Sequence, residues 1–228
     1  CMESDPAVLA GGADGTSAEE DLGVVSVTDC AGANIVWSTV FADDKSVMPN
    51  GPKTIADFFD TTKFPGKRGL RKSPKATLEM ALAADGVAPE DVYEVLGTDE
   101  GVDRAFAKLD TIKNDVVWWE AGAQPPQLLA DGEVAMTTAY NGRIFNAVAS
   151  ENKPFEIVWD AQVFDFDMWA IVKGAPNAEL AMDFLKFSTE TAQLAAQASY
   201  ISYGPARKSS APLVSTYHSN PDLDMGPQ

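Results

Sequence analysis

The stretch VVWWEAGAQPPQLLADGEVAMTTAYNGRIF (116–145) alternates strand-like and helix-like segments, and it decides the fold class. Residues 116–119 are β-branched and aromatic, as expected for a buried strand. The paired prolines that follow favour a helix start, and the next glycine favours a helix end. A second strand over 134–139 and a second helix over 141–150 continue the pattern. Strands that alternate with helices are typical of α/β proteins with largely parallel sheets.

The same alternation is expected on both sides of this stretch. Ser73 and Pro74 have the pattern of a helix N-cap followed by the first helical residue. The sequence predicts strands over 34–41, 155–159 and 163–171, and helices over 73–85, 178–188 and 190–199. We find no internal repeat, and 228 residues suffice for one large domain or two small ones.

Composition excludes several classes of function. The chain has 34 Asp and Glu against 17 Lys and Arg, a net charge of −17, which repels nucleic acids and anionic membranes and attracts cationic solutes. A solubilising surface is the alternative explanation of the charge. The single histidine, His218, lies in a polar C-terminal segment, so neither a histidine-rich zinc site nor a Ser-His-Asp triad is expected. Glycine-rich nucleotide motifs are also absent, and we expect no cofactor and no metal.

Acidic and aromatic side chains suggest an amine-binding site. On a strand, Asp165 and Asp167 share one face, and Phe164 and Phe166 share the other. Two neighbouring carboxylates favour a cation between them, although an exposed strand would also tolerate the pair. Aromatic rings, which bind alkylammonium groups or pack in cores, gather near strand ends and turns: Trp118, Trp119, Tyr140, Trp159, Phe166, Trp169 and Tyr203.

Two positions at the ends of predicted elements add to this site. Glu120 follows a strand and precedes a helix, the place where α/β proteins bind their ligands. The helix start at Ser73 would suit a ligand carboxylate, so amino-acid-like and betaine-like ligands remain open. Cys1 and Cys30 are the only cysteines. The sequence leaves three states open for them. The two cysteines form a disulfide in an oxidising compartment, both are buried free thiols, or Cys1 is the lipid-modified N-terminus of an exported protein.

The sequence resembles a family of transport proteins. The stretch 116–145, together with GPKTIADFFDTTKFPGKRGLRKSPKATLEMALAADG (51–86), VFDFDMWAIVKGAPNAELAMDFLKF (163–187) and YISYGPARKSS (200–210), looks like the spermidine/putrescine-type periplasmic binding proteins of bacterial ABC importers. The resemblance covers nearly all of residues 30–215. It implies a small-molecule ligand, a membrane permease as partner, a periplasmic location and a monomer that is not an enzyme.

The resemblance also implies a fold, the two-lobed type II fold of periplasmic binding proteins, with a ligand in the cleft. Residues 1–40 and 167–205 would form a first, incomplete lobe, and 44–163 with 206–228 the second. The crossovers would lie near 37–43 and 164–168. Both ends of the family's chain would then be missing.

Site residues follow from the resemblance position by position. Asp167 stands where the family has the aspartate that binds a polyamine nitrogen, Tyr140 stands at a stacking aromatic, and Tyr203 at a late tyrosine turn. Asp165 replaces an aromatic, and Ser73 and Ala76 replace an acidic pair, which favours a cationic or zwitterionic solute other than a polyamine itself. The predicted ligand-binding residues are Trp37, Ser73, Trp119, Glu120, Tyr140, Asp165, Asp167 and Tyr203.

A second class of function uses two of the same residues. Glu120 and Asp167 could serve as the carboxylate pair of a secreted carbohydrate-acting hydrolase, flanked by aromatic rings. Carboxyl groups at the separation of a glycosidase pair would favour this alternative.

Overall fold

A computed structural model describes residue 1 and residues 9–12, 14–23 and 27–225. The chain divides into two compact units, one formed by Cys1–Trp37 and Phe164–Gln228 and the other by Ser38–Val163. We call these unit 1 and unit 2. The chain passes from one unit to the other within two long strands, β2 (Ala31–Asp44) and β6 (Phe155–Ala170). The sequence had predicted β6 as two separate strands.

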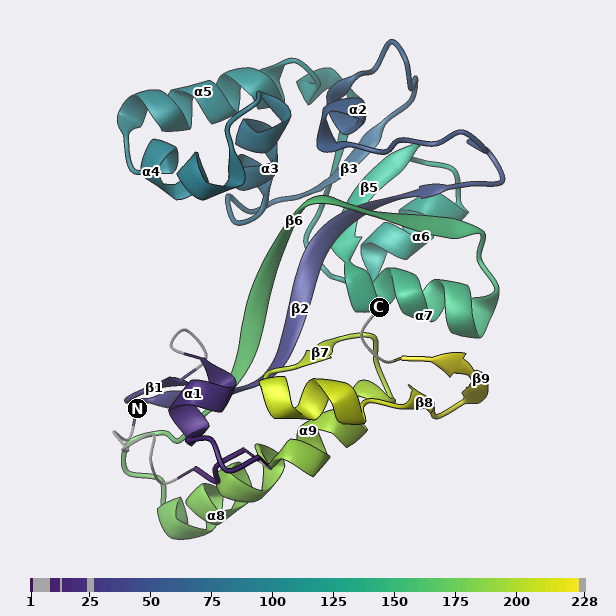
Figure 1. Ribbon diagram of the computed structural model, residues 1–228. Helices are drawn as coiled ribbons and strands as arrows, with labels where there is room; N and C mark the ends of the chain where they lie inside the picture. Colours follow the sequence, from purple (N-terminus) through teal and green to yellow (C-terminus); the bar gives the residue numbers. More distant parts are fainter. Residues whose placement is uncertain (2–8, 13, 24–26, 226–228) are drawn as a thin grey trace. The chain divides into compact units, whose positions relative to one another are not determined.

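Unit 2 is an α/β unit in which the strands run in the order β2-β5-β3-β4, and β6 pairs with β2 (Figure 1). Strands β3 and β4 are parallel, as are β3 and β5, whereas β5 is antiparallel to β2. The strands are β3 (Arg68–Arg71), β4 (Val116–Trp119) and β5 (Met136–Tyr140). The helices are α2 (Ile55–Phe59), α3 (Thr77–Ala84), α4 (Val92–Leu96), α5 (Asp99–Asp110), α6 (Gln124–Ala130) and α7 (Asn141–Glu151), with 3-10 turns at Pro89–Asp91 and Lys113–Asp115.

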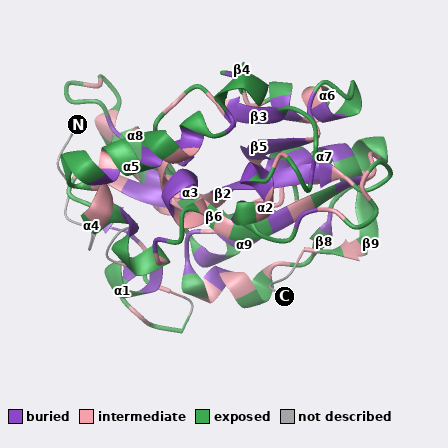
Figure 2. Cartoon of the chain, turned by 90° about the horizontal axis from the view of Figure 1, so that it is seen from above, coloured by how far each residue is buried: buried purple, intermediate pink, exposed green. Residues whose placement is uncertain are grey.

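Helices cover both faces of this sheet because its strands place apolar residues on both sides. Phe41 and Met136 pack into a core shared with α2, α3 and α5, whereas Ala42 and Ala139 pack into a second core shared with α6 and α7. Figure 2 shows β3 and β5 largely buried. Strands that are apolar on both faces are typical of parallel sheets sandwiched between helices. The alternation predicted from residues 116–145 is therefore present.

Asp43, near the end of β2, is a buried carboxylate that destabilises unit 2 when it ionises. Its side chain is 2% exposed. Burial and the negative charge of Glu156 raise its pKa to about 6, and Lys53 opposes that shift. Because the folded chain holds the proton more tightly than the unfolded chain does, stability increases as the pH falls through about 6.

We expect Asp43→Asn to remove this pH dependence. At pH 8 the variant should be more stable than the wild type, by up to about 3 kcal/mol, because it has no charge to bury. Below about pH 3, where Asp43 is protonated in both the folded and the unfolded chain, the two proteins should differ little. Urea denaturation across this pH range provides the measurement, with the exposed Asp103→Asn as control. An equal gain at pH 3 and pH 8 would contradict the titration.

Unit 1 is built around the other halves of β2 and β6. Two short strands, β1 (Val27–Thr28) and β7 (Gly204–Pro205), pair antiparallel with β2. The remaining elements are α1 (Ala18–Leu22), α8 (Ala178–Ser188), α9 (Thr191–Ala198), a 3-10 helix (Lys208–Leu213) and the hairpin of β8 (Thr216–Tyr217) and β9 (Asn220–Asp224). A disulfide joins Cys1 to Cys30, with the Cα atoms 5.5 Å apart. This is one of the three states that the sequence left open.

The C-terminal segment belongs to unit 1, and its predicted place in the second lobe was wrong. The guanidinium of Arg207 pairs with Asp21 of α1 at 3.0 Å, and Ser209 donates its backbone N–H to the same carboxylate at 2.8 Å. His218 donates its backbone N–H to Ser199 at the end of α9, at 2.9 Å. These contacts join residues far apart in the sequence, so local patterns gave no sign of them. Residues 226–228 of the predicted lobe lie outside the described residues.

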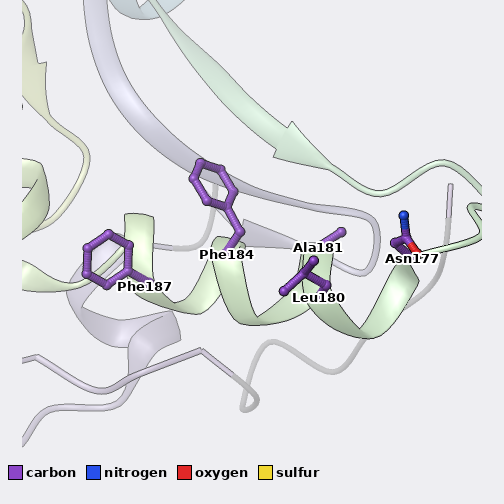
Figure 3. Close-up of a pocket in the computed structure, with 5 residues that line it drawn as sticks. All are labelled: Asn177, Leu180, Ala181, Phe184 and Phe187. Carbon is purple, nitrogen blue, oxygen red and sulfur yellow. The ribbon is translucent and has the colours of Figure 1, made fainter.

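Helix α8 presents apolar side chains on two faces. Leu185 packs into the core of unit 1, whereas Leu180, Phe184 and Phe187 are 69%, 52% and 54% exposed. Figure 3 shows these three along an apolar pocket on α8, which Asn177 and Ala181 also line. Exposed apolar patches of this kind promote association between molecules.

We expect the double variant Leu180→Gln/Phe187→Gln to aggregate less than the wild type. Both side chains are already in water, so stability should change by no more than about 0.5 kcal/mol for each substitution. Light scattering at high protein concentration and binding of an apolar dye should both fall. Unchanged scattering would show that another surface drives association.

Candidate functional site

The first group of candidate residues lies at one edge of the unit 2 sheet. Strand register places Arg71 beside Trp119, at the carboxyl ends of β3 and β4. Tyr140 ends the neighbouring parallel strand β5, and it is also the N-cap residue of α7. Open α/β sheets bind ligands at the carboxyl ends of their strands. We call this group, Arg71, Trp119, Tyr140 and Arg143, the carboxyl edge.

Tyr140 is the centre of the carboxyl edge. The guanidinium carbon of Arg71 lies 5.6 Å from the centroid of its ring, within the range of a cation–π contact. Trp119 meets the same ring edge-on, at 5.7 Å between centroids and 90° between planes. Trp119 itself is fully buried, and its indole N–H has no hydrogen-bond partner among the described residues. Its predicted contact with ligand stays a prediction, and its visible role is to support Tyr140.

Two of the five arginines have neither an acidic partner nor a side-chain hydrogen bond among the described residues. Arg104 and Arg207 each pair with an aspartate, and the buried Arg68 donates to backbone oxygens of the segment before it. Arg71 and Arg143 make no ion pair with any described residue. Both belong to the carboxyl edge. An ideal Cβ atom on Gly122 would lie 2.8 Å from the Tyr140 ring and 3.9 Å from Nε of Arg143, so the ring and the Arg143 side chain both lie beside Gly122. Two unpaired guanidinium groups in so acidic a chain favour binding of an anionic group.

Neither arginine was predicted from the sequence. Arg71 and Arg143 stand out only once the strand ends are aligned and the other arginines are assigned to partners. The signal that could have indicated them is position: each lies at or just beyond the carboxyl end of a predicted strand.

Glu120 and Ser73 lie next to the carboxyl edge. Glu120 pairs with Lys72 at 3.4 Å, and both side chains are about 70% exposed. Ser73, however, is not a helix N-cap: α3 begins at Thr77, and its N-cap is Ala76. Ala76 has φ of 66°, a left-handed conformation that interrupts any helix running from Ser73. The predicted helix N-terminus at Ser73 was therefore wrong.

The second group of candidate residues lies in unit 1. Nε1 of Trp37 donates to a carboxylate oxygen of Asp167 at 3.0 Å, so the side chain of the aspartate is oriented while most of it stays exposed. Asp165 accepts a hydrogen bond at 2.9 Å from the backbone N–H of Phe166. Gly204 pairs with Val36, so Tyr203 directly precedes this pair on one segment and Trp37 directly follows it on β2. Trp37 and Asp167 are thus in contact, and Tyr203 comes just before the strand that pairs beside Trp37.

The described part of the chain offers little support for other kinds of site. Among its residues, no cluster of three or more His, Cys, Asp or Glu side chains has the arrangement of a metal site. No described helix is both long and apolar enough to cross a lipid bilayer.

Comparison with known proteins establishes the family. Residues 4–224 match the family of bacterial extracellular solute-binding proteins, and the chain belongs to it. Membership implies a location outside the cytoplasm. The two α/β units agree with the fold of solved periplasmic binding proteins, as predicted.

Individual relatives bind small molecules. The chain is 49% identical over 187 residues to a gamma-aminobutyric acid (GABA)-binding protein of Pseudomonas aeruginosa. The matched residues make up 82% of this chain and 53% of the relative. The periplasmic binding protein MotA of A. tumefaciens B6, solved with glucopine, is 36% identical with a TM-score of 0.82, over 93% of this chain and 64% of that one. The Atu4243-GABA receptor is 33% identical with a TM-score of 0.78, over 96% of this chain and 65% of that one. The chain therefore spans between half and two thirds of their length.

Spermidine/putrescine-type proteins are more distant. Two such structures are 20% and 13% identical to this chain, so their likeness shows the fold alone. The predicted resemblance was right about the family and too narrow about the ligand. The relatives are solute-binding proteins, and none of these comparisons supports the hydrolase alternative with Glu120 and Asp167.

Proposed function

We propose that this chain is the solute-binding part of an ABC importer and that its ligand is GABA or a similar small amino acid. The observation that carries this proposal is that Arg71 and Arg143, at the carboxyl edge of unit 2, form no ion pair with any described residue. A guanidinium group binds a carboxylate through paired, charge-assisted hydrogen bonds. GABA-binding relatives support the choice of ligand.

The other end of such a ligand is an ammonium group, and Asp167 is the residue we assign to it. Its carboxylate is exposed and held by Trp37, which leaves one oxygen for a charge-assisted hydrogen bond. Trp37 and Tyr203 supply aromatic faces for the alkyl chain and the cation. Asp165, Ser73 and Glu120 remain proposed neighbours of the ligand.

A polyamine fits these groups less well. Spermidine and putrescine carry only positive charges, and Arg71 and Arg143 would repel them. The acidic pair expected for a polyamine site is also replaced by Ser73 and Ala76, as the sequence indicated. The ligand would be collected outside the cytoplasm, in the periplasm, and handed to the membrane permease of the importer.

Calorimetric titration with four ligands tests the proposal. GABA has both charges, whereas butyrate lacks the ammonium, butylamine lacks the carboxylate, and putrescine replaces the carboxylate with a second ammonium. We expect GABA to bind about 10- to 100-fold more tightly than each of the other three, because each lost charged contact contributes about 1.5–3 kcal/mol. Equal binding of GABA and putrescine would contradict the proposal and favour a polyamine-type ligand.

A further inference from the structure

We propose that Gly122 is a positioning residue for the ligand site, because the absence of its side chain lets the Tyr140 ring lie where Arg71 stacks on it. The inference rests on the proposed function. An ideal Cβ on Gly122 would lie 2.8 Å from Cε2 and 2.9 Å from Cδ2 of Tyr140. Carbon atoms do not approach so closely, so a methyl group here and the present ring position exclude each other.

The obstruction at Gly122 comes from the ring and not from the backbone. Gly122 is absent from the glycines with positive φ, so alanine could adopt its backbone conformation. Gly132, which follows helix α6, differs in both respects. Its φ is 67°, and an ideal Cβ on it would have open space around it. The two glycines therefore serve different purposes: one permits a turn, and the other makes room for an aromatic ring.

Tyr140 can respond to a methyl group only by turning its side chain. Its backbone pairs with Thr39 of β2, and the side chain of the next residue, Asn141, accepts a hydrogen bond at 3.0 Å from the backbone N–H of Ser38. The Trp119 ring stands at 90° to the Tyr140 ring on another side. Rotation of the ring away from residue 122 would therefore break its alignment with the Arg71 guanidinium.

The test is a double-mutant cycle on GABA affinity, with Gly122→Ala made in the wild type and in Tyr140→Ala. We expect Gly122→Ala alone to weaken GABA binding about 5- to 10-fold, the effect of losing an oriented cation–π partner. In the Tyr140→Ala background, where there is no ring to displace, the same substitution should have almost no further effect. Equal losses in both backgrounds, or no loss in either, would overturn the inference.

A ligand-free measurement separates this inference from the proposed function. If the wild type binds none of the four ligands, the proposed function fails, and the crystal structure of Gly122→Ala still decides the role of Gly122. A Tyr140 ring displaced from Arg71 in that structure supports the inference, and a ring in its original place overturns it. Thermal unfolding of the variant should stay close to that of the wild type, since Gly122 is only half-buried, in the loop between β4 and α6.

Discussion

Arg207→Met is expected to lower the stability of unit 1 by about 3–5 kcal/mol, because it leaves the carboxylate of Asp21 buried without its cation. The exposed fractions of the two side chains are 0% and 2%. Burial raises the pKa of Asp21, but the hydrogen bonds from Ser209 and the charge of Arg207 outweigh it and hold that pKa below its usual value. The ionised pair is therefore the stable form at neutral pH.

The effect of this substitution is large because Arg207 joins three separate segments. Besides Asp21 of α1, its guanidinium donates to the backbone oxygens of Ala10 and of Thr189, which ends α8. Removing the guanidinium takes the donor away from the backbone oxygens of Ala10 and Thr189 and leaves Asp21 with the hydrogen bonds from Ser209 alone, which adds to the cost of the lost ion pair.

Arg104→Met provides the matched control. Arg104 also pairs with an aspartate, Asp85, at 2.6 Å, but these side chains are 46% and 38% exposed. An exposed pair contributes about 0–1 kcal/mol. Urea denaturation of both variants measures the difference. Equal losses for Arg104→Met and Arg207→Met would show that burial does not determine the contribution of the pair.

The double variant Arg207→Met/Asp21→Leu adds a second check. With both charges gone, no ion remains buried without a partner, so the double variant should be more stable than Arg207→Met alone. If the loss of stability in the double variant equals the sum of the losses in Arg207→Met and Asp21→Leu, the ion pair itself adds no net stability, and the hydrogen bonds of the two side chains to other residues account for the losses.

The sequence predicted the elements of unit 2 well because their signals are local. Buried strands such as 116–119 are β-branched and aromatic, and prolines and glycines mark the bounds of the helix between them. Ser73 shows the limit of local signals. Ser73 and Pro74 have the residue types of an N-cap and a first helical residue. However, the backbone of Ala76 has a positive φ, so the helix begins only at Thr77, and an alanine does not indicate such a conformation in the sequence.

Contacts between side chains far apart in the chain could not be predicted from the sequence. Arg207 and Asp21 are 186 residues apart, so nothing near either position indicated that residues 207–209 contact α1. A different limit applied to the candidate site. Trp119, Glu120 and Tyr140 were singled out from strand ends, whereas Arg71 and Arg143 become informative only when the partners of every other arginine are known.

Asp167→Asn is expected to weaken GABA binding about 10- to 100-fold, as the loss of one charge-assisted hydrogen bond to the ligand ammonium requires. The substitution is conservative in shape. Asparagine keeps an oxygen that can accept the hydrogen bond from Nε1 of Trp37, now at 3.0 Å, so the side chain should keep its place. Calorimetric titration measures the affinity, and Asp183→Asn, an exposed acid on α8, controls for the change in net charge.

The choice of ligand makes this prediction specific. Butyrate has no ammonium group, so Asp167→Asn should leave its binding unchanged or strengthen it, because a repelling carboxylate is removed. Arg143→Met should have the complementary pattern. It should weaken the binding of GABA and of butyrate equally and leave the binding of butylamine unchanged. Opposite patterns from the two variants would assign the ammonium of the ligand to Asp167 and its carboxylate to Arg143. If Asp167→Asn instead weakened GABA and butyrate equally, the carboxylate of Asp167 would not bind the ammonium, and the effect on GABA would reflect a change in protein structure.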